Sequence, residues 1–208
     1  MEAGELHFED VEVPHENLLG AEDGTGFKAA MQCFDFSRPC VATQAVGVAQ
    51  GAVDLALDYA TRRQVFDQPL AAHQGVQMKL AAMEAEILAA RALAYQASAM
   101  VDEGHPRTTK FSSAAKLVAS EVAMRATTQA VDVLGGNGYL RGFPAERMMR
   151  DAKVLQIYEG ANDIQRLVLA REMAGEAESR EAVWPEWMPG APGVASGEGP
   201  EAREQAPA

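Results

Sequence analysis

Glu159 is the residue whose neighbours best suit it to chemistry. Ile157 and Tyr158 precede it, and Gly160 follows it, where a turn can begin. A carboxylate held among such neighbours would be partly desolvated, which makes it a better acceptor for the proton of a weak carbon acid. A Glu near a helix end is also an ordinary capping residue. Spacing alone leaves both interpretations open, general base and helix cap.

Three other groups of residues could contact a ligand. Asp35 and Arg38 are spaced i,i+3 and would share one helix face, as a solvated ion pair also would. Arg63 carries a planar fork that can donate two hydrogen bonds to one phosphate. Gly135 and Gly136 begin a glycine cluster that permits positive φ angles and close backbone approach, although a plain helix C-cap has the same composition. Each group therefore has a structural interpretation and a binding one.

Four motifs, in one order, resemble the C-terminal half of the acyl-CoA dehydrogenase family. They lie at residues 8–14, at Arg63 with Phe66 and Pro69-Leu70, at residues 135–139, and at residues 157–165. The last, Ile-Tyr-Glu-Gly followed by a polar pair and Ile-Gln, resembles the family's catalytic-base signature. The family fold has an N-terminal helical domain, a middle β domain that holds the flavin, and a C-terminal four-helix bundle. The resemblance spans residues 5 to about 175, so this chain lacks the first domain and most of the second.

The resemblance implies an acid–base role for one residue. Glu159 would remove the α-proton of an acyl-CoA thioester while the β-hydrogen leaves as hydride to FAD, giving a trans-2-enoyl-CoA. The segment that matches Asp35 and Arg38 lines the acyl-CoA cavity, and Tyr158 and Gly160 flank the base as further substrate-side residues. Some relatives have their catalytic Glu at the position of Ser37. Since Ser37 is not an acid, this chain has no second candidate for the base at that position. The reduced flavin would pass electrons to an electron-transfer flavoprotein.

The resemblance also implies FAD contacts, several of them across a subunit interface. Arg63 would reach the flavin dinucleotide of a neighbouring subunit, residues 132–136 would cradle its adenosine-diphosphate end, and residues 161–163 would contact the flavin. The full set is Arg63, Gln64, Val65, Phe66, His73, Gln74, Asp132, Val133, Leu134, Gly135, Gly136, Ala161, Asn162 and Asp163. A shared site implies a homo-oligomer, a dimer or tetramer, or else a partner subunit that carries the β domain.

Four residues depart from the family pattern at these contacts. Asp67 replaces a Gly, Asp132 replaces a Gln, Ala161 cannot donate a hydrogen bond, and Asp163 adds a further carboxylate. One hypothesis is that the chain supplies the catalytic Glu and the oligomerising domain of a truncated or split dehydrogenase, weakly active or inactive by itself. The alternative is a non-catalytic oligomerising helical bundle, a decayed paralogue. A flavin oxidase or nitroalkane-oxidising relative fits a Glu base less well.

The elements that must position these residues are mainly helical. Apolar residues recur with 4-3 spacing over about 27–63, 72–102 and 108–134, which predicts three long antiparallel helices with alanine-rich seams. A short helix over 145–153 and a last helix from just beyond Glu159 accompany them, so the expected fold is an antiparallel four-helix bundle. Thr108 is expected to cap the third long helix, and Gly104 to end the second.

The two ends of the chain have a different pattern. Residues 5–13 alternate between apolar and polar types and predict a short β-strand, closed by Pro14, as a remnant of the β domain. The stretch beyond Gly175 is rich in Glu, Ala, Pro and Gly and is predicted to be disordered. The expected organisation is a β remnant and linker over 1–23, a helical bundle domain over 24–175, and an acidic tail over 176–208.

Composition narrows the partners and the compartment. The 208 residues carry 18 Lys and Arg against 30 Asp and Glu, a net charge of −12. With no Lys/Arg block in the sequence, we expect binding neither to nucleic acid nor to a membrane. Cys33 and Cys40 lack Cys-x-x-Cys spacing and are expected to be buried, reduced thiols, and four scattered His predict no metal site. No signal-peptide pattern is present, so the expected location is cytoplasmic.

Overall fold

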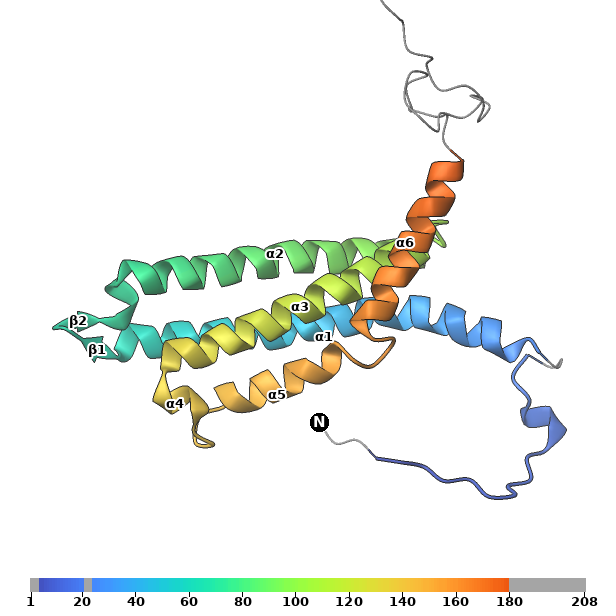
Figure 1. Cartoon of the computed structure of the whole chain (residues 1–208), viewed down its shortest axis with the longest axis horizontal. Helices are drawn as coiled ribbons and strands as arrows, with labels where there is room; N and C mark the ends of the chain where they lie inside the picture. The colour runs from blue at the N-terminus through green and yellow to red at the C-terminus, as the bar shows by residue number, and fades with distance from the viewer. Residues whose placement is uncertain (1–3, 21–23, 180–208) are drawn as a thin grey trace, which may run out of the picture. The chain divides into compact units, whose positions relative to one another are not determined.

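The computed structural model describes residues 4–20 and 24–179 (Figure 1). The chain divides into two units, residues 1–172 and 173–208, so the packing given below is that of the first unit. The elements in chain order are a 3-10 turn at His15–Asn17, α1 (Gly26–Arg62), β1 (Gln64–Val65), β2 (Gln68–Pro69), a 3-10 turn at Leu70–Ala72, α2 (Gln74–Asp102), α3 (Thr108–Leu134), α4 (Gly136–Tyr139), α5 (Ala145–Leu155) and α6 (Asn162–Glu178).

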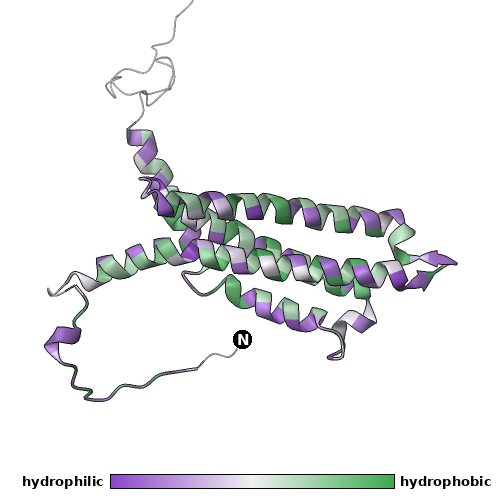
Figure 2. Ribbon diagram, turned by 180° about the vertical axis from the view of Figure 1, so that it is seen from behind, coloured by the Kyte–Doolittle hydropathy of each residue, from purple (hydrophilic) through white to green (hydrophobic). Residues whose placement is uncertain are grey.

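Helices α1, α2, α3 and α5 form the bundle. Helix α3 packs against α1, α2 and α5, and α1 also packs against α2 and α5. Apolar and polar residues alternate along the long helices (Figure 2), and the buried residues of each helix recur every three or four positions. Alanines dominate the buried seam of α1 and α3, at Ala42, Ala45, Ala49, Ala52, Ala56, Ala115, Ala119, Ala123, Ala126 and Ala130. Small side chains let the helix axes approach closely. The mainly helical bundle is therefore confirmed.

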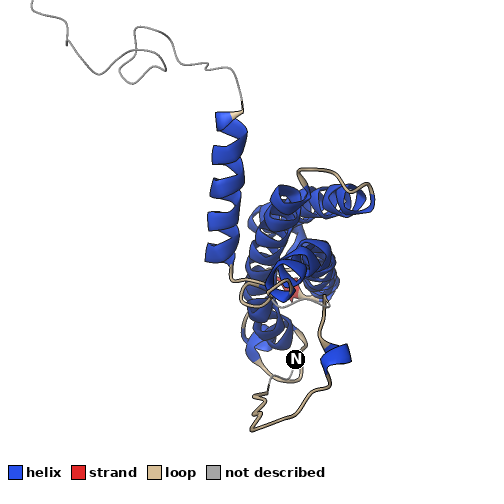
Figure 3. Ribbon diagram, turned by 90° about the vertical axis from the view of Figure 1, so that its right-hand side faces the viewer, coloured by secondary structure: helices blue, strands red, loops and turns tan. Residues whose placement is uncertain are grey.

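The predicted N-terminal strand is wrong. Residues 5–13 have no regular structure, and the apolar side chains of the segment, such as Phe8 and Val13, are exposed. A strand needs a hydrogen-bonded neighbour. Across residues 4–20 and 24–179, the only strands are β1 and β2, which pair with each other. Figure 3 shows that helices and loops make up nearly all of the described chain.

Two local predictions are also wrong. Arg107, and not Thr108, is the N-cap residue of α3, and the Thr108 hydroxyl donates to the carbonyl oxygens of Met100 at 3.1 Å and His105 at 2.6 Å. Cys33 and Cys40 are free thiols and are exposed, because both lie off the buried stripe of α1. Gly104 does follow the end of α2, with a φ of +61°.

Helix α1 has the composition of a core helix. It is the one helix in the described part of the chain that is long and apolar enough to cross a membrane by length and composition, with a hydropathy of 1.3 over an 18-residue window. Because 44% of that window is buried and the helix packs against α2, α3 and α5, we assign it to the core of the bundle. At the other end of the chain, α6 extends to Glu178, and residues 180–208 of the predicted tail lie outside the described residues.

Candidate active site

The loop between α5 and α6 presents Glu159 in a strained conformation. The amide of Asn162 donates to the carbonyl oxygen of Gln156 at 3.0 Å, which closes the loop. Within it, Glu159 has a φ of +57° and Gly160 a φ of +91°. A left-handed φ costs a residue with a Cβ atom roughly 1 kcal/mol. Isolated strain of this kind is common at functional sites. The loop therefore turns Glu159 out of the helical path instead of using it as a helix cap.

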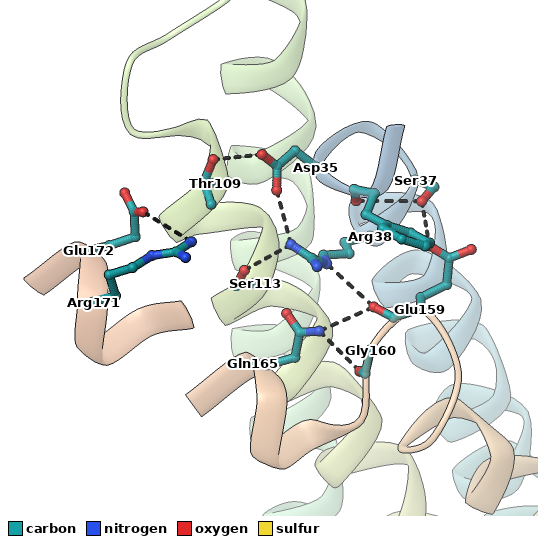
Figure 4. Close-up of polar contacts among 11 residues, drawn as sticks. Asp35, Ser37, Arg38, Thr109, Ser113, Glu159, Gly160, Gln165, Arg171 and Glu172 are labelled. Atoms are coloured by element: carbon teal, nitrogen blue, oxygen red, sulfur yellow. Dashed lines mark hydrogen bonds and ion pairs between the residues drawn. The ribbon is translucent and has the colours of Figure 1, made fainter. Parts of the chain in front are cut away.

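The Glu159 carboxylate meets α1. Its Oε2 atom accepts a hydrogen bond from the Ser37 hydroxyl at 2.5 Å (Figure 4), while Oε1 has no hydrogen-bond partner among the described residues. The neighbouring Tyr158 hydroxyl donates to Oε1 of Gln44 at 2.5 Å. Burial, and then the negative charge of Glu159, raise the pKa of Tyr158, so the phenol keeps its proton at neutral pH. One carboxylate oxygen is thus fixed and the other is free to accept a proton.

Three buried side chains hold the backbone on which this carboxylate stands. The carbonyl oxygen of Glu159 accepts from Arg38 Nε at 3.4 Å and from Gln165 Nε2 at 3.1 Å. The carbonyl oxygen of Gly160 accepts from Gln165 Nε2 at 3.0 Å and from Lys116 Nζ at 2.8 Å. Figure 4 shows the contacts of Arg38 and Gln165 converging on this turn. The loop is therefore fixed from α1, α3 and α6 at once.

Arg38 links the loop to two helices. Its Nη1 donates to Asp35 Oδ1 at 3.0 Å and to the Ser113 hydroxyl at 3.3 Å, and Asp35 Oδ2 accepts from the Thr109 hydroxyl at 2.6 Å. Burial lowers the pKa of Arg38, and the carboxylates of Asp35 and Glu159 oppose that effect. Asp35 and Arg38 are thus brought next to Glu159, as expected, and their contact with a substrate stays a prediction.

Lys116 is a residue of this site that the sequence analysis missed, and it had included Gln165 only as the end of the motif over residues 157–165. Lys116 lies on the buried face of α3 with an exposed fraction of 0%. Burial, and then repulsion from Arg38, lower its pKa to about 8, while the charge of Glu159 acts in the opposite direction. The sequence could have pointed to Lys116, because it lies between Ala115 and Ala119 in an alanine-rich seam. A charged side chain that is buried in such a seam requires polar partners.

A second group of predicted residues lines a cavity of about 350 Å³ beyond the C-terminal end of α3. The lining residues are Tyr59, Arg63, Val65, Leu70, Val133, Leu134, Gly135, Gly136 and Asn137. The exposed Arg63 side chain forms no hydrogen bond or ion pair with another described residue, and a Cβ atom added at Gly136 would meet nothing within 4 Å. A free guanidinium beside open glycine backbone fits the diphosphate of a dinucleotide. The structure therefore brings together Arg63, Val65 and residues 133–136 of the predicted cofactor set.

The remaining predicted residues of the hairpin, α2 and α3 are not among those that line this cavity. Asp132 Oδ2 is 3.7 Å from Lys79 Nζ, so a cation accompanies that unexpected carboxylate. Phe66 stands at the tip of the β1–β2 hairpin, and its ring meets the His73 ring edge to face at 6.1 Å. Gln64, in β1, and Gln74, the first residue of α2, are both exposed. None of these residues lines the cavity.

Residues 161–163 lie apart from this cavity, beside Glu159. Asn162 turns its side chain inward, where Oδ1 accepts from Lys116 at 3.0 Å and from the Ser120 hydroxyl at 3.1 Å. Ala161 is exposed, and the exposed Asp163 forms an ion pair with Arg166 at 2.8 Å. Fourteen residues of α3, roughly 21 Å at 1.5 Å per residue, separate Ser120 from the C-terminal end of the helix. One chain therefore presents the predicted FAD contacts as two separate groups.

Comparisons with known proteins agree with this arrangement. Residues 24–174 match the family model for the C-terminal domain of acyl-CoA dehydrogenases. The chain is 50% identical over 173 residues to cyclohexane-1-carbonyl-CoA dehydrogenase of Geobacter metallireducens, covering 83% of this chain and 45% of that protein. It is 47% identical to butyryl-CoA dehydrogenase of Megasphaera elsdenii in a solved structure, with a TM-score of 0.77, covering 80% of this chain and 43% of that one.

A further solved structure, described as the electron transferring flavoprotein of Acidaminococcus fermentans, contains a chain that is 46% identical, with a TM-score of 0.77 and coverage of 80% and 43%. This chain spans less than half the length of the relatives that it matches. The family model nevertheless covers the whole bundle together with the Glu159 loop and the Arg63 cavity. The chain belongs to the acyl-CoA dehydrogenase family, and residues 24–174 are its C-terminal domain.

Proposed function

We propose that this chain supplies the catalytic base and the oligomerising helical domain for the α,β-dehydrogenation of an acyl-CoA thioester by an FAD-dependent enzyme. The observation that carries the proposal is the state of Glu159. Its backbone is held in a left-handed conformation, Ser37 fixes one carboxylate oxygen, and the other oxygen is free. A base must lie within hydrogen-bond reach of the proton that it takes, and this geometry provides one unoccupied acceptor.

In this mechanism Glu159 Oε1 removes the α-proton of the thioester. FAD, when bound, supplies the acceptor for the β-hydrogen as hydride. The main-chain N–H of Glu159 donates to no described residue, so it is free to stabilise the negative charge that develops on the thioester carbonyl oxygen. The buried charges of Arg38 and Lys116 attract the carboxylate before proton transfer. The chain thereby contributes the base, one oxyanion donor and the rigid loop that carries both.

The cofactor would lie between subunits. The separation of the Arg63 cavity from Glu159 supports an oligomer in which one subunit offers Arg63, Gly135 and Gly136 to the dinucleotide whose flavin lies beside the Glu159 of its neighbour. The assembly is either a homo-oligomer of this protein or a complex with a different subunit that carries the β domain. An electron-transferring flavoprotein is the proposed electron acceptor, supported by the description of one matched structure.

A chimera tests the proposal by joining this chain to the part of a relative that it does not span. In it, this chain replaces the matching C-terminal part of Megasphaera elsdenii butyryl-CoA dehydrogenase, and activity is measured with butyryl-CoA, cyclohexane-1-carbonyl-CoA and an artificial electron acceptor. We expect turnover of at least one thioester. We further expect Glu159→Gln to lower kcat by about 10²- to 10⁴-fold, the usual contribution of a general base. The exposed Glu103→Gln is the matched control and should keep full activity.

The negative outcome is equally specific. A chimera that forms a yellow, FAD-loaded oligomer but leaves both thioesters unchanged would contradict the dehydrogenase role and support the non-catalytic bundle.

The absorbance spectrum of this chain alone, mixed with FAD, gives the second measurement. Because the proposed contacts at the Arg63 cavity would reach only the diphosphate part of a flavin dinucleotide, we expect the chain alone to remain colourless.

A further inference from the structure

Among the described residues, Lys116 is the largest fully buried side chain, and it forms no ion pair with a described carboxylate. Its ammonium group donates to the carbonyl oxygen of Gly160 at 2.8 Å and to Oδ1 of Asn162 at 3.0 Å. Burying an ammonium is costly unless oxygen atoms take the place of water. A core position between alanines could hold an apolar residue without that cost. The role of Lys116 is therefore to hydrogen-bond the loop, and not merely to occupy space in the core.

Both partners of Lys116 belong to the turn that follows the base. Gly160 is the residue directly after Glu159, and Asn162 is the first residue of α6. Asn162 Oδ1 also accepts from the Ser120 hydroxyl at 3.1 Å, so two side chains of α3 grip the same amide oxygen. The Asn162 side chain is 7% exposed and points into the bundle. Lys116 thus ties the end of the loop and the start of α6 to α3.

The hydrogen bond from Lys116 to Gly160 helps to hold the loop in its strained backbone conformation. Glu159 and Gly160 both have positive φ angles, and a strained backbone persists only where surrounding contacts hold it. Arg38 and Gln165 hold the Glu159 carbonyl, whereas Lys116 is the one charged donor on the Gly160 carbonyl. Without it, Gln165 alone would restrain that peptide group. The conformation that aims the Glu159 carboxylate at Ser37 would then be one of several that the loop samples.

We propose that Lys116 is a positioning residue that holds the loop of residues 156–162 in the conformation presenting the Glu159 carboxylate. The inference rests on the proposed role of Glu159 as the base. Lys116 takes no proton in the reaction and touches no substrate; it acts through the main chain of Gly160. Its position, 43 residues before Glu159 in sequence and on another helix, makes this a tertiary contact.

Hydrogen–deuterium exchange on the full chain tests the positioning role without any activity. Lys116→Met removes the donor with little change in length, and Lys116→Gln keeps a shorter, neutral donor in case the Met variant does not fold. We expect faster deuterium uptake over residues 156–162 in a folded variant, with α2 and the rest of α3 still protected. The exposed Lys28→Met is the control and should leave uptake as in the parent chain. Unchanged uptake over 156–162 in either folded Lys116 variant would overturn the proposal.

Kinetics of the chimera described above give the second measurement. Loss of orientation at a reacting group can cost about 10²-fold in rate, so we expect Lys116→Met to lower kcat by roughly 10- to 100-fold while KM stays within about twofold and FAD remains bound. A KM effect with an unchanged kcat would contradict positioning of the base. If the parent chimera is inactive, the proposed function fails, while the deuterium-uptake experiment still decides the role of Lys116.

Discussion

Glu159 adopts a backbone conformation that its own Cβ atom disfavours, and the residue after it has to be glycine. Gly160 has a φ of +91°, and a Cβ atom added there would lie 2.5 Å from Nε2 of the fully buried Gln165. That nitrogen donates to the carbonyl oxygens of both Glu159 and Gly160. A side chain at Gly160 would therefore strain the turn and also displace the donor that holds it. The chemistry of one residue here depends on the absence of a side chain at the next.

We expect Gly160→Ala to destabilise the full chain by about 1–3 kcal/mol, since it adds left-handed strain and disturbs two buried hydrogen bonds. The measurement is the free energy of unfolding from urea titration. Gly47→Ala is the matched control, because Gly47 is exposed inside α1 with nothing within 4 Å of an added Cβ atom. That control should gain about 0.5–1 kcal/mol from the higher helix propensity of Ala. Equal shifts for the two variants would show that Gly160 is unconstrained.

At the scale of elements, the β1–β2 hairpin carries the most unusual turn beside the proposed cofactor cavity. Gln64 pairs with Pro69 and Val65 with Gln68, which leaves Phe66 and Asp67 as the two turn residues. Their φ angles are +50° and +61°, the pattern of a type I′ turn, in which Gly is preferred at the second position. Asp67 thus combines local strain with a negative charge near the proposed diphosphate site. Substitutions at Asp67 can therefore separate the effect of backbone strain from the effect of the charge.

Asp67→Gly should stabilise the chain by up to about 1 kcal/mol through relief of the positive φ. In the chimera it should also tighten FAD binding by about two- to fivefold, the size of one exposed charge interaction. Asp67→Asn removes the charge and keeps the turn preference, so it should tighten FAD binding without changing stability. Urea titration and FAD titration measure the two effects. FAD affinity that stays constant in both variants would rule out the charge as the cause.

At the scale of the whole molecule, the proposed flavin contacts occupy two distant places on one chain. Arg63 lies at the C-terminal end of α1, beside the cavity at the end of α3, and Glu159 lies next to the first half of both helices. An assembly in which each flavin meets Arg63 of one subunit and Glu159 of another satisfies both groups. An assembly in which Arg63 and Glu159 of one and the same subunit contact one flavin does not.

Subunit complementation distinguishes these assemblies. Chimeras carrying Arg63→Met and Glu159→Gln, each inactive alone, are unfolded together and reassembled. If the two residues act on a flavin from different subunits, mixed dimers contain one site with both substitutions and one with neither, so about a quarter of the parental activity should return from random pairing. If the residues act from the same subunit, every site keeps one defect and no activity returns. Reassembly of the parent chimera alone is the control for yield.

Local patterns in the sequence determined the helices and the end of α2, because apolar spacing decides which face of a helix is buried. The residues around Glu159 left base and helix cap both open, and the resemblance to the acyl-CoA dehydrogenase family selected it as the proposed base. The unformed strand at residues 5–13 shows the limit of such patterns, because a strand depends on partners that a local pattern does not supply.

Only the tertiary structure decided how Glu159 is held and how the proposed cofactor residues are grouped. Ser37, Arg38 and Lys116 reach the base from helices 43 or more residues away in sequence, and no local spacing encodes those contacts. The same packing placed Arg63 with residues 133–136 and left residues 161–163 at the other group. The physical reason is that helix formation depends on neighbours along the chain, whereas a site built from several helices depends on how their faces meet.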